Sequence, residues 1–201
     1  MTAAQRRIVV GISGASGSIY GYRALTMLAD TDVEVHLVLS AAARRTLVTE
    51  TDLRPHDLEE LADVVHPTSD IGASIASGSF RTLGMLIAPC SIKTMSEIAH
   101  GITDNLMSRA ADVTLKERRR LVLMVRETPL HAGHLTSMLT LSQLGAVIAP
   151  PVPAMYTRPR SIDDIVAHSV GRALDLFDIE TASIPRWGED LPAAPNKEER
   201  P

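Results

Sequence analysis

Short apolar runs without polar alternation recur along this chain, and they constrain its fold more than any other feature. The first, at residues 8–12, is β-branched and apolar almost throughout, which is typical of a strand buried on both faces of a parallel sheet. Further strands are expected at residues 33–39, 85–88, 121–125 and 146–149, with a short one near 63–66. Stretches with helical spacing lie between them, at 19–28, 41–48, 94–99, 105–116, 135–144 and 162–177. This alternation predicts an α/β fold with right-handed crossovers. We expect a Rossmann-like (flavodoxin-type), doubly wound parallel sheet in three layers, α/β/α.

The chain has 201 residues, 45% of them hydrophobic, which is enough for one domain with a sizeable core. We expect a single domain over residues 1–187. Residues 54–78 are polar and mixed and are expected to form a surface excursion. Residues 188–201 are rich in Pro, Glu and Ala, so we expect a flexible tail.

Composition excludes several classes of function. A net charge of −4 and an aromatic content of 3% give no footprint for nucleic acid. Neither a signal peptide nor a membrane span is expected from the apolar runs, so we expect a cytoplasmic protein. Cys90 is the only cysteine, which rules out an internal disulfide and a cysteine-based zinc site within one chain. Cys90 is expected to be a small buried packing residue.

A glycine-rich segment, residues 11–17, follows the first predicted strand and precedes a predicted helix. Its glycines let the backbone approach a ligand, and Ser13 and Ser16 add hydroxyls, which suits a phosphate or the polar edge of a flavin. The segment lacks the lysine of a P-loop, and Ser13 takes the place of the second glycine of the dinucleotide-binding pattern. A purely structural turn is the alternative.

A parallel sheet binds its ligands beyond the carboxyl ends of its strands, and further polar groups follow the later predicted strands. Ser40 could cap the next helix or touch a cofactor, and residues 89–94 form another hydroxyl-rich entry to a helix. Arg126 and Glu127 could form a surface ion pair or serve a ligand.

In the last third, Arg172 is expected to have an anionic partner, either a ligand or a protein carboxylate. Trp187 by default anchors the chain end. His131 and His134 lack further ligands at a useful spacing, so capping or solvated histidines are favoured over a metal pair.

Together these segments resemble the UbiX-like flavin prenyltransferase family, and most of all its members that are encoded beside phenolic-acid decarboxylases. The resemblance runs from about residue 7 to 188. The matching pieces are GISGASG at 11–17, SAA…TET at 40–51, PCSIKTMSEIAHG at 89–101, DNLMSRAADVTLKERRRLVL at 104–123, RETPLH at 126–131, LGAVIAPPVPAMY at 144–156 and PRW at 185–187.

The resemblance implies that a dimethylallyl group is joined from dimethylallyl monophosphate to N5 and C6 of reduced FMN. The implied FMN contacts are Gly14, Ala15, Ser16, Ser40, Ser91, Ile92, Lys93, Thr94 and Arg126. The implied donor contacts are Lys116, Arg126, Tyr156, Arg172, Trp187 and Glu50, with Glu50 approaching from a neighbouring subunit. The implied catalytic residues are Glu127 as acid/base, Lys116, Tyr156 and Ser16, with no metal.

The resemblance also implies a homo-oligomer, a dodecamer, and a UbiD-like aromatic-acid decarboxylase that receives the prenylated FMN. Two alternatives remain. One is a non-catalytic flavin-binding subunit of a decarboxylase. The other is a flavin-dependent cysteine decarboxylase, which is disfavoured because the turn reads PCSIKT, with Lys93 where those enzymes carry asparagine.

Overall fold

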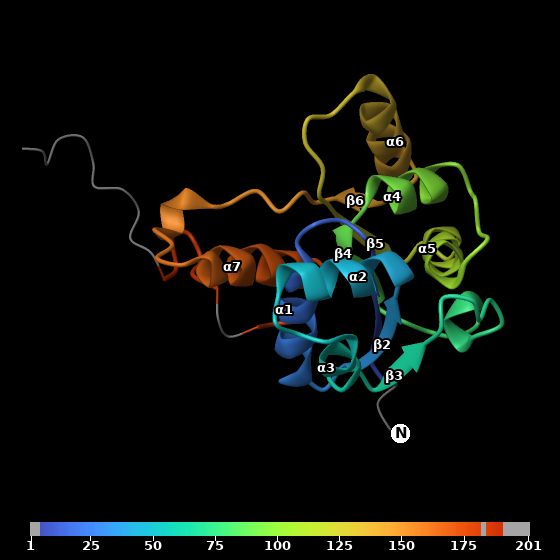
Figure 1. Cartoon of the computed structure of the whole chain (residues 1–201), viewed down its shortest axis with the longest axis horizontal. Helices are drawn as coiled ribbons and strands as arrows, with labels where there is room; N and C mark the ends of the chain where they lie inside the picture. Colours follow the sequence, from blue (N-terminus) through green and yellow to red (C-terminus); the bar gives the residue numbers. More distant parts are fainter. Residues whose placement is uncertain (1–4, 182–183, 191–201) are drawn as a thin grey trace, which may run out of the picture.

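The structure is a computed structural model that describes residues 5–181 and 184–190. Within these residues, six strands form one parallel sheet in the order β3-β2-β1-β4-β5-β6 (Figure 1). The strands are β1 (Arg7–Ile12), β2 (Glu34–Leu39), β3 (Val64–His66), β4 (Gly84–Cys90), β5 (Arg120–Val125) and β6 (Val147–Ile148). The α-helices are α1 (Ser18–Ala29), α2 (Ala41–Glu50), α3 (Pro55–Glu59), α4 (Ile92–Ala99), α5 (Leu106–Lys116), α6 (Ala132–Gln143) and α7 (Ile162–Asp175). Two 3-10 turns, η1 (Ser74–Ala76) and η2 (Met155–Thr157), complete the set.

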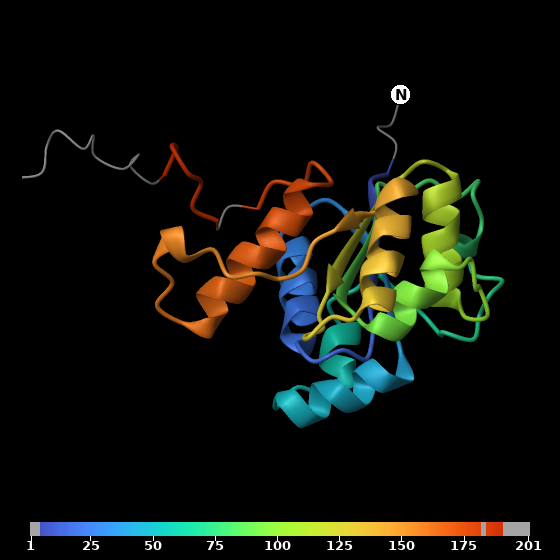
Figure 2. The same cartoon turned by 90° about the horizontal axis from the view of Figure 1, so that it is seen from above.

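The central strands are buried on both faces, as their unbroken apolar sequences predict. Ile8, Val10 and Ile12 of β1 belong to a core cluster that includes residues of α1 and α7. Val9, on the opposite face, belongs to a second cluster with residues of α4, α5 and α6. Figure 2 shows these two helical layers on either side of the sheet. The predicted three-layer, doubly wound α/β fold is therefore confirmed.

The predicted strands and longer helices are confirmed with small shifts at their ends. Sequence patterns did not predict α3, which begins with Pro55 at its first turn and is too short to show a helical period. Among the described residues, no helix is both long and apolar enough to cross a membrane. Most of the expected tail lies outside the described residues. Its first residues, 188–190, form a turn in which Asp190 accepts a hydrogen bond from the Arg186 N–H at 2.8 Å.

The sheet changes direction of winding between β1 and β4, which are neighbours although two strands separate them in sequence. Ligands of such sheets bind beyond the carboxyl ends of the strands at this switch point. The loops after β1 and β4 meet there, because the Ser13 N–H donates to the Pro89 carbonyl at 3.2 Å.

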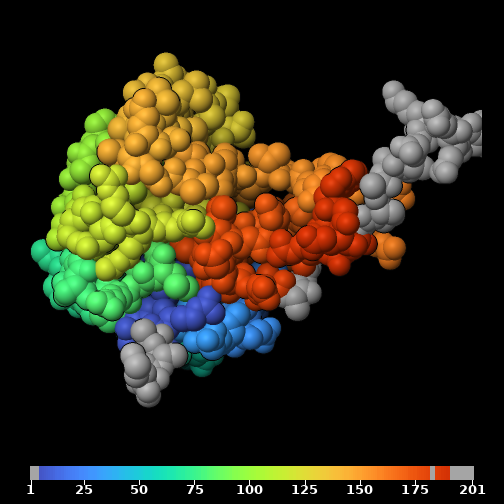
Figure 3. Space-filling view, turned by 180° about the vertical axis from the view of Figure 1, so that it is seen from behind, coloured from blue at the N-terminus to red at the C-terminus, as the bar shows by residue number. Residues whose placement is uncertain are grey.

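The chain leaves the sheet after β6 as an extended arm, residues 149–161, before α7 returns along α1. In Figures 1 and 2, η2 lies on the side of the molecule opposite α5 and α6. The space-filling view in Figure 3 shows the arm and α7 projecting from the body of the sheet domain.

Candidate active site

The first loop is held close to α2 and to the turn after β4. A Cβ placed on Gly14 would lie 2.3 Å from the Cβ of Ala42, so only glycine permits this approach. Ser13 is fully buried, and its hydroxyl donates to the Pro89 carbonyl at 2.9 Å while accepting from the Ser91 N–H at 2.7 Å. Ser13 is therefore occupied by the protein, whereas Gly14 and Ser16 are exposed.

Glu50 binds the C-terminal end of this loop, at Gly17 and Ser18. Its carboxylate accepts hydrogen bonds from the Gly17 N–H at 2.9 and 3.1 Å and from the Ser18 N–H at 2.9 Å. Burial acts to raise the pKa of Glu50, but hydrogen bonds from Ser16, Ser18 and Gly17 outweigh it and lower the pKa. The expected approach of Glu50 to a phosphate site of a neighbouring subunit stays a prediction, and within its own chain Glu50 binds the loop. The physical reason is that α2 ends directly beside the positive N-terminus of α1.

This position of Glu50 narrows what the loop can bind. The first N–H groups of α1, which a phosphate would use, already donate to a carboxylate. A phosphate dianion at the same place would face a like charge. The loop is therefore suited to the polar edge of a flavin ring at residues 14–16, and the phosphate alternative for the helix N-terminus is disfavoured.

The next two strand ends present capped helices. The Ser40 hydroxyl accepts from the Ala43 N–H at 3.0 Å and begins α2, and the Ser91 hydroxyl accepts from the Thr94 N–H at 3.3 Å and begins α4. The capping interpretation of Ser40 is correct, and because its oxygen acts as an acceptor there, its hydroxyl hydrogen can still donate to a ligand. Lys93 lies on the outer face of α4, where it pairs with Glu97.

Arg126 and Glu127 follow β5 and are both exposed. Neither side chain takes part in an ion pair within residues 5–181 and 184–190, so the surface-pair interpretation is wrong for the described chain. Burial raises the pKa of Tyr20 on α1, and the positive charge of Arg126 partly offsets that rise. Arg126 therefore lies within electrostatic reach of Tyr20 on α1.

A second cluster of predicted residues lies on the arm, α7 and the end of the described chain. The Tyr156 ring packs edge-on against the Trp187 ring, with centroids 5.4 Å apart and an interplanar angle of 88°. Arg172 pairs with Asp175 at 2.7 Å, so the carboxylate partner expected for it exists. The Arg186 guanidinium binds both oxygens of the same carboxylate, at 2.8 and 3.1 Å. These pairs tie Arg172 and Arg186 into one unit, whereas Trp187 is 58% exposed and packs on Tyr156 of the arm, so its expected anchoring against the body stays a prediction.

Lys116 stands apart from both groups. It is the last residue of α5, which runs antiparallel to the strands and ends shortly before β5 begins at Arg120. Lys116 therefore lies near the amino ends of the strands, whereas Glu127 follows the carboxyl end of β5. Within one chain, the structure does not bring the predicted phosphate ligands together.

Three minor candidates have structural roles. Cys90 is fully buried, and burial raises the pKa of its thiol far above the ordinary range. His131 begins α6, where its Nδ1 accepts from the Gly133 N–H at 3.1 Å. Its ring lies against His134, with centroids 3.6 Å apart. The packing and capping interpretations of these residues are confirmed.

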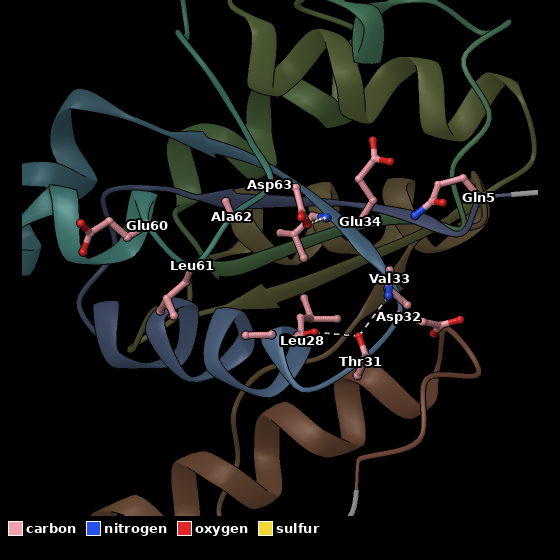
Figure 4. Close-up of a pocket in the computed structure, with 12 residues that line it drawn as sticks. Gln5, Leu28, Thr31, Asp32, Val33, Glu34, Glu60, Leu61, Ala62 and Asp63 are labelled. Atoms are coloured by element: carbon pink, nitrogen blue, oxygen red, sulfur yellow. Dashed lines mark hydrogen bonds between the residues drawn. The ribbon is translucent and has the colours of Figure 1, made fainter.

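A hollow of about 480 Å³ lies at the amino end of β2, on the opposite edge of the sheet from Glu127 (Figure 4). Its lining includes the carboxylates of Asp32, Glu34, Glu60 and Asp63. Asp63 accepts from the Val35 N–H at 2.7 Å. Its negative charge makes it a poor site for a phosphate, so the carboxyl edge remains the candidate active site.

Comparison with known proteins identifies the family. The flavoprotein family model matches residues 2–174. Flavin prenyltransferase UbiX of Escherichia coli strain K12 is 61% identical over 175 residues, which is 87% of this chain and 93% of that protein. The structure of AnUbiX in complex with FMN and dimethylallyl pyrophosphate superposes with a TM-score of 0.90 at 51% identity, covering 91% of this chain and 97% of that one. A dodecameric FMN-dependent UbiX-like decarboxylase from Escherichia coli O157:H7 superposes with a TM-score of 0.88 at 47% identity, covering 90% and 98%. The chain therefore belongs to the flavoprotein family and, within it, to the UbiX-like flavin prenyltransferases.

Proposed function

We propose that this protein joins the dimethylallyl group of dimethylallyl monophosphate to N5 and C6 of reduced FMN. The product, prenylated FMN, serves a UbiD-like aromatic-acid decarboxylase. The observation that carries the proposal is that Arg126 and Glu127 are both exposed directly after the carboxyl end of β5, in a chain 61% identical to a flavin prenyltransferase. A cytoplasmic location stays a prediction from the sequence.

The residues at the carboxyl edge fit FMN. Gly14 and Ser16 are exposed, the Ser40 hydroxyl can donate, and the Arg126 guanidinium has no carboxylate partner among the described residues. Hydroxyl and N–H donors suit the carbonyls and nitrogens of the flavin edge. When bound, reduced FMN supplies the nucleophilic positions that accept the allyl group.

The charged residues act on the leaving group and on the proton. Arg126, Lys116, Arg172 and the Tyr156 phenol hold the phosphate of the donor and stabilise the negative charge that builds up as it departs. Trp187 lines the prenyl group, and its ring face stabilises positive charge on the allyl carbons. Ring closure breaks the double bond of the N5-linked allyl group, so Glu127 acts as acid and base: its carboxyl donates a proton to allyl C2 as C3 bonds to C6, and its carboxylate takes up the proton released at C6.

We propose further that each site is assembled from several subunits of a homo-oligomer, in the manner of a dodecamer. The support is the separation, within one chain, of three groups: the loop with Arg126 and Glu127, then Lys116, then the cluster of Tyr156, Arg172 and Trp187. Exposed apolar side chains accompany these groups, on α6 at Leu135 and Leu139 and on the arm at Val152 and Met155. Large apolar side chains exposed at separate places on the chain are consistent with more than one subunit contact.

The proposal is tested by incubating the purified protein anaerobically with reduced FMN and either dimethylallyl monophosphate or the pyrophosphate. Mass spectrometry of the extracted flavin should show the added five-carbon group, and Glu127→Gln should lower the yield by at least about tenfold, as expected for loss of a general acid/base. Absence of the adduct with both donors would refute the transferase. A non-catalytic subunit predicts that absence together with stimulation of a decarboxylase.

The shared-site model is tested by mixing. Glu127→Gln and Tyr156→Phe remove residues from different groups, so hybrid oligomers contain some sites with neither change. Co-expression of the two variants should restore activity above either variant alone. Purely additive activities, or a monomeric mass in solution near 21.7 kDa, would refute the shared site.

A further inference from the structure

His168 of α7 is a buried polar residue in direct contact with Tyr156. Its side chain belongs to a residue that is only 8% exposed, and its Nε2 lies 3.2 Å from the Tyr156 hydroxyl oxygen. The two rings meet edge-on, with centroids 5.7 Å apart and an interplanar angle of 86°. His168 also lines a cavity of about 250 Å³ together with Arg172 and arm residues 150–152. His168 thus contacts Tyr156 and lines the same cavity as Arg172, and both of these residues are predicted to bind the phosphate.

The direction of this hydrogen bond decides what Tyr156 can do. A phenol has one proton to donate, and the oxygens of a phosphate dianion can only accept. If that proton points to His168, Tyr156 presents lone pairs to the phosphate and repels it. If His168 instead carries a proton on Nε2 and donates it, the phenol proton is free to point at the phosphate.

We propose that His168 is a positioning residue for the prenyl donor: its Nε2–H donates to the Tyr156 hydroxyl oxygen and directs the phenol proton toward the phosphate. This proposal rests on the proposed function, since it concerns the same donor site. His168 acts through Tyr156 and does not touch the reacting atoms.

Burial and nearby charges set the protonation of His168. Burial lowers the pKa of His168 and the charge of Arg172 lowers it further, while Asp175 opposes both. Several other charged or titratable groups lie near the His168 ring or contact Arg172 and Asp175. They are Tyr156 on η2, Arg158 and Arg160 after it, Asp164, Arg172 and Asp175 on α7, and Arg186. At neutral pH the ring is neutral, so the tautomer sets the direction of the hydrogen bond. At lower pH the imidazolium donates at Nε2 in every molecule.

The test compares His168→Leu, which cannot donate, with His168→Gln, whose amide N–H can. His168→Leu should raise the KM for dimethylallyl monophosphate roughly three- to tenfold, the effect of one lost hydrogen bond, with a smaller change in kcat. His168→Gln should recover most of this loss. Ser169→Ala is the matched control, because Ser169 lines the same cavity and its hydroxyl donates to the Ile165 carbonyl within the helix. It should leave KM unchanged.

A double-mutant cycle separates positioning from general destabilisation. In a Tyr156→Phe background, His168→Leu should have no further effect on KM, because the hydroxyl that it orients is gone. Additive effects of the two substitutions would overturn the proposal. FMN binding, measured by flavin fluorescence, should be the same for the wild type, the two single variants and the double variant.

The pH profile gives a second readout that does not depend on the leucine variant folding. The ratio of wild-type KM to His168→Gln KM should fall as pH decreases, because only the wild type gains a charged donor, and the titration of the phosphate itself cancels in the ratio. A ratio that is constant with pH overturns the proposal.

Failure of the proposed function is distinguishable from failure of this inference. If the wild type makes no prenylated flavin, inorganic phosphate titrated calorimetrically into the wild type and into His168→Leu still reports on His168. Weaker phosphate binding by the variant supports the positioning role. Equal binding, or no binding to either, overturns it.

Discussion

Removal of the Glu50 carboxylate should loosen the start of α1 and the ligand loop before it. The carboxylate accepts from two N–H groups over distances of 2.9–3.1 Å, in the position of a helix cap supplied from a distant helix. The Gly17 residue that precedes α1 has no side chain to cap it. Glu50 therefore replaces the missing local cap.

The magnitude follows from these contacts. Loss of a capping side chain costs about 1 kcal/mol, and loss of an exposed negative charge at a helix N-terminus costs roughly 0.3–1 kcal/mol. Glu50→Ala removes both and should destabilise the protein by about 1.5 kcal/mol. Glu50→Gln keeps an acceptor oxygen and should cost about 0.5 kcal/mol. For a chain of 201 residues, the alanine variant should melt about 3–6 °C lower.

The effect should depend on pH in a defined direction. Because the pKa of Glu50 is lowered from its ordinary 4.5, its stabilisation is fully present above that value and is lost as pH falls through the folded-state pKa. Urea unfolding of wild type and Glu50→Gln at equal protein concentration, at pH 7 and pH 3.5, measures this difference. Glu60→Gln is the control, since among the described residues Glu60 pairs with exposed His56 on α3 and with no other cation. Equal stability of Glu50→Gln and wild type at pH 7, or an undiminished difference at pH 3.5, would refute the capping role.

Three further predictions concern the same edge and the far side of the sheet. Gly14→Ala should push the loop away from Ala42, cost about 1–3 kcal/mol and weaken FMN binding measured by fluorescence quenching; unchanged binding would contradict the close approach. Ser13→Ala should cost about 1–3 kcal/mol in urea unfolding, because it leaves buried polar partners unpaired; a neutral result would contradict the bridge. Burial and the charge of His36 lower the pKa of His66, so stability should fall as pH decreases below the ordinary value of 6.5, and His66→Gln should flatten that fall between pH 7.5 and 5.5.

The sheet was predictable because each strand can be recognised from its own local sequence. Unbroken apolar runs such as residues 8–12 mark strands buried on both faces, and helical spacing marks the segments between them. Local capping was also predictable, because Ser40 immediately precedes its helix. The short helix α3 and the turn η2 have too few residues to show any period.

Contacts between distant segments were not predictable from local pattern. Glu50 lies 32 residues beyond Ser18 in sequence, and nothing near either residue indicates that they meet. The bridge made by Ser13 depends likewise on the turn after β4. His168 gave no signal because a lone histidine among apolar helix residues is usually a packed core residue, and its role depends on the path of the arm.

The triple contact of Asp175 with Arg172 and Arg186 has a practical consequence for protein engineering. It fastens the chain to α7 one residue before Trp187. A purification tag or fusion partner attached after Asp190 would therefore start within a few residues of Trp187 and its contact with Tyr156. The chain enters β1 at Arg7, and Figure 2 shows this point well separated from residues 184–190. Labels, tethers and surface-immobilisation handles are better placed there.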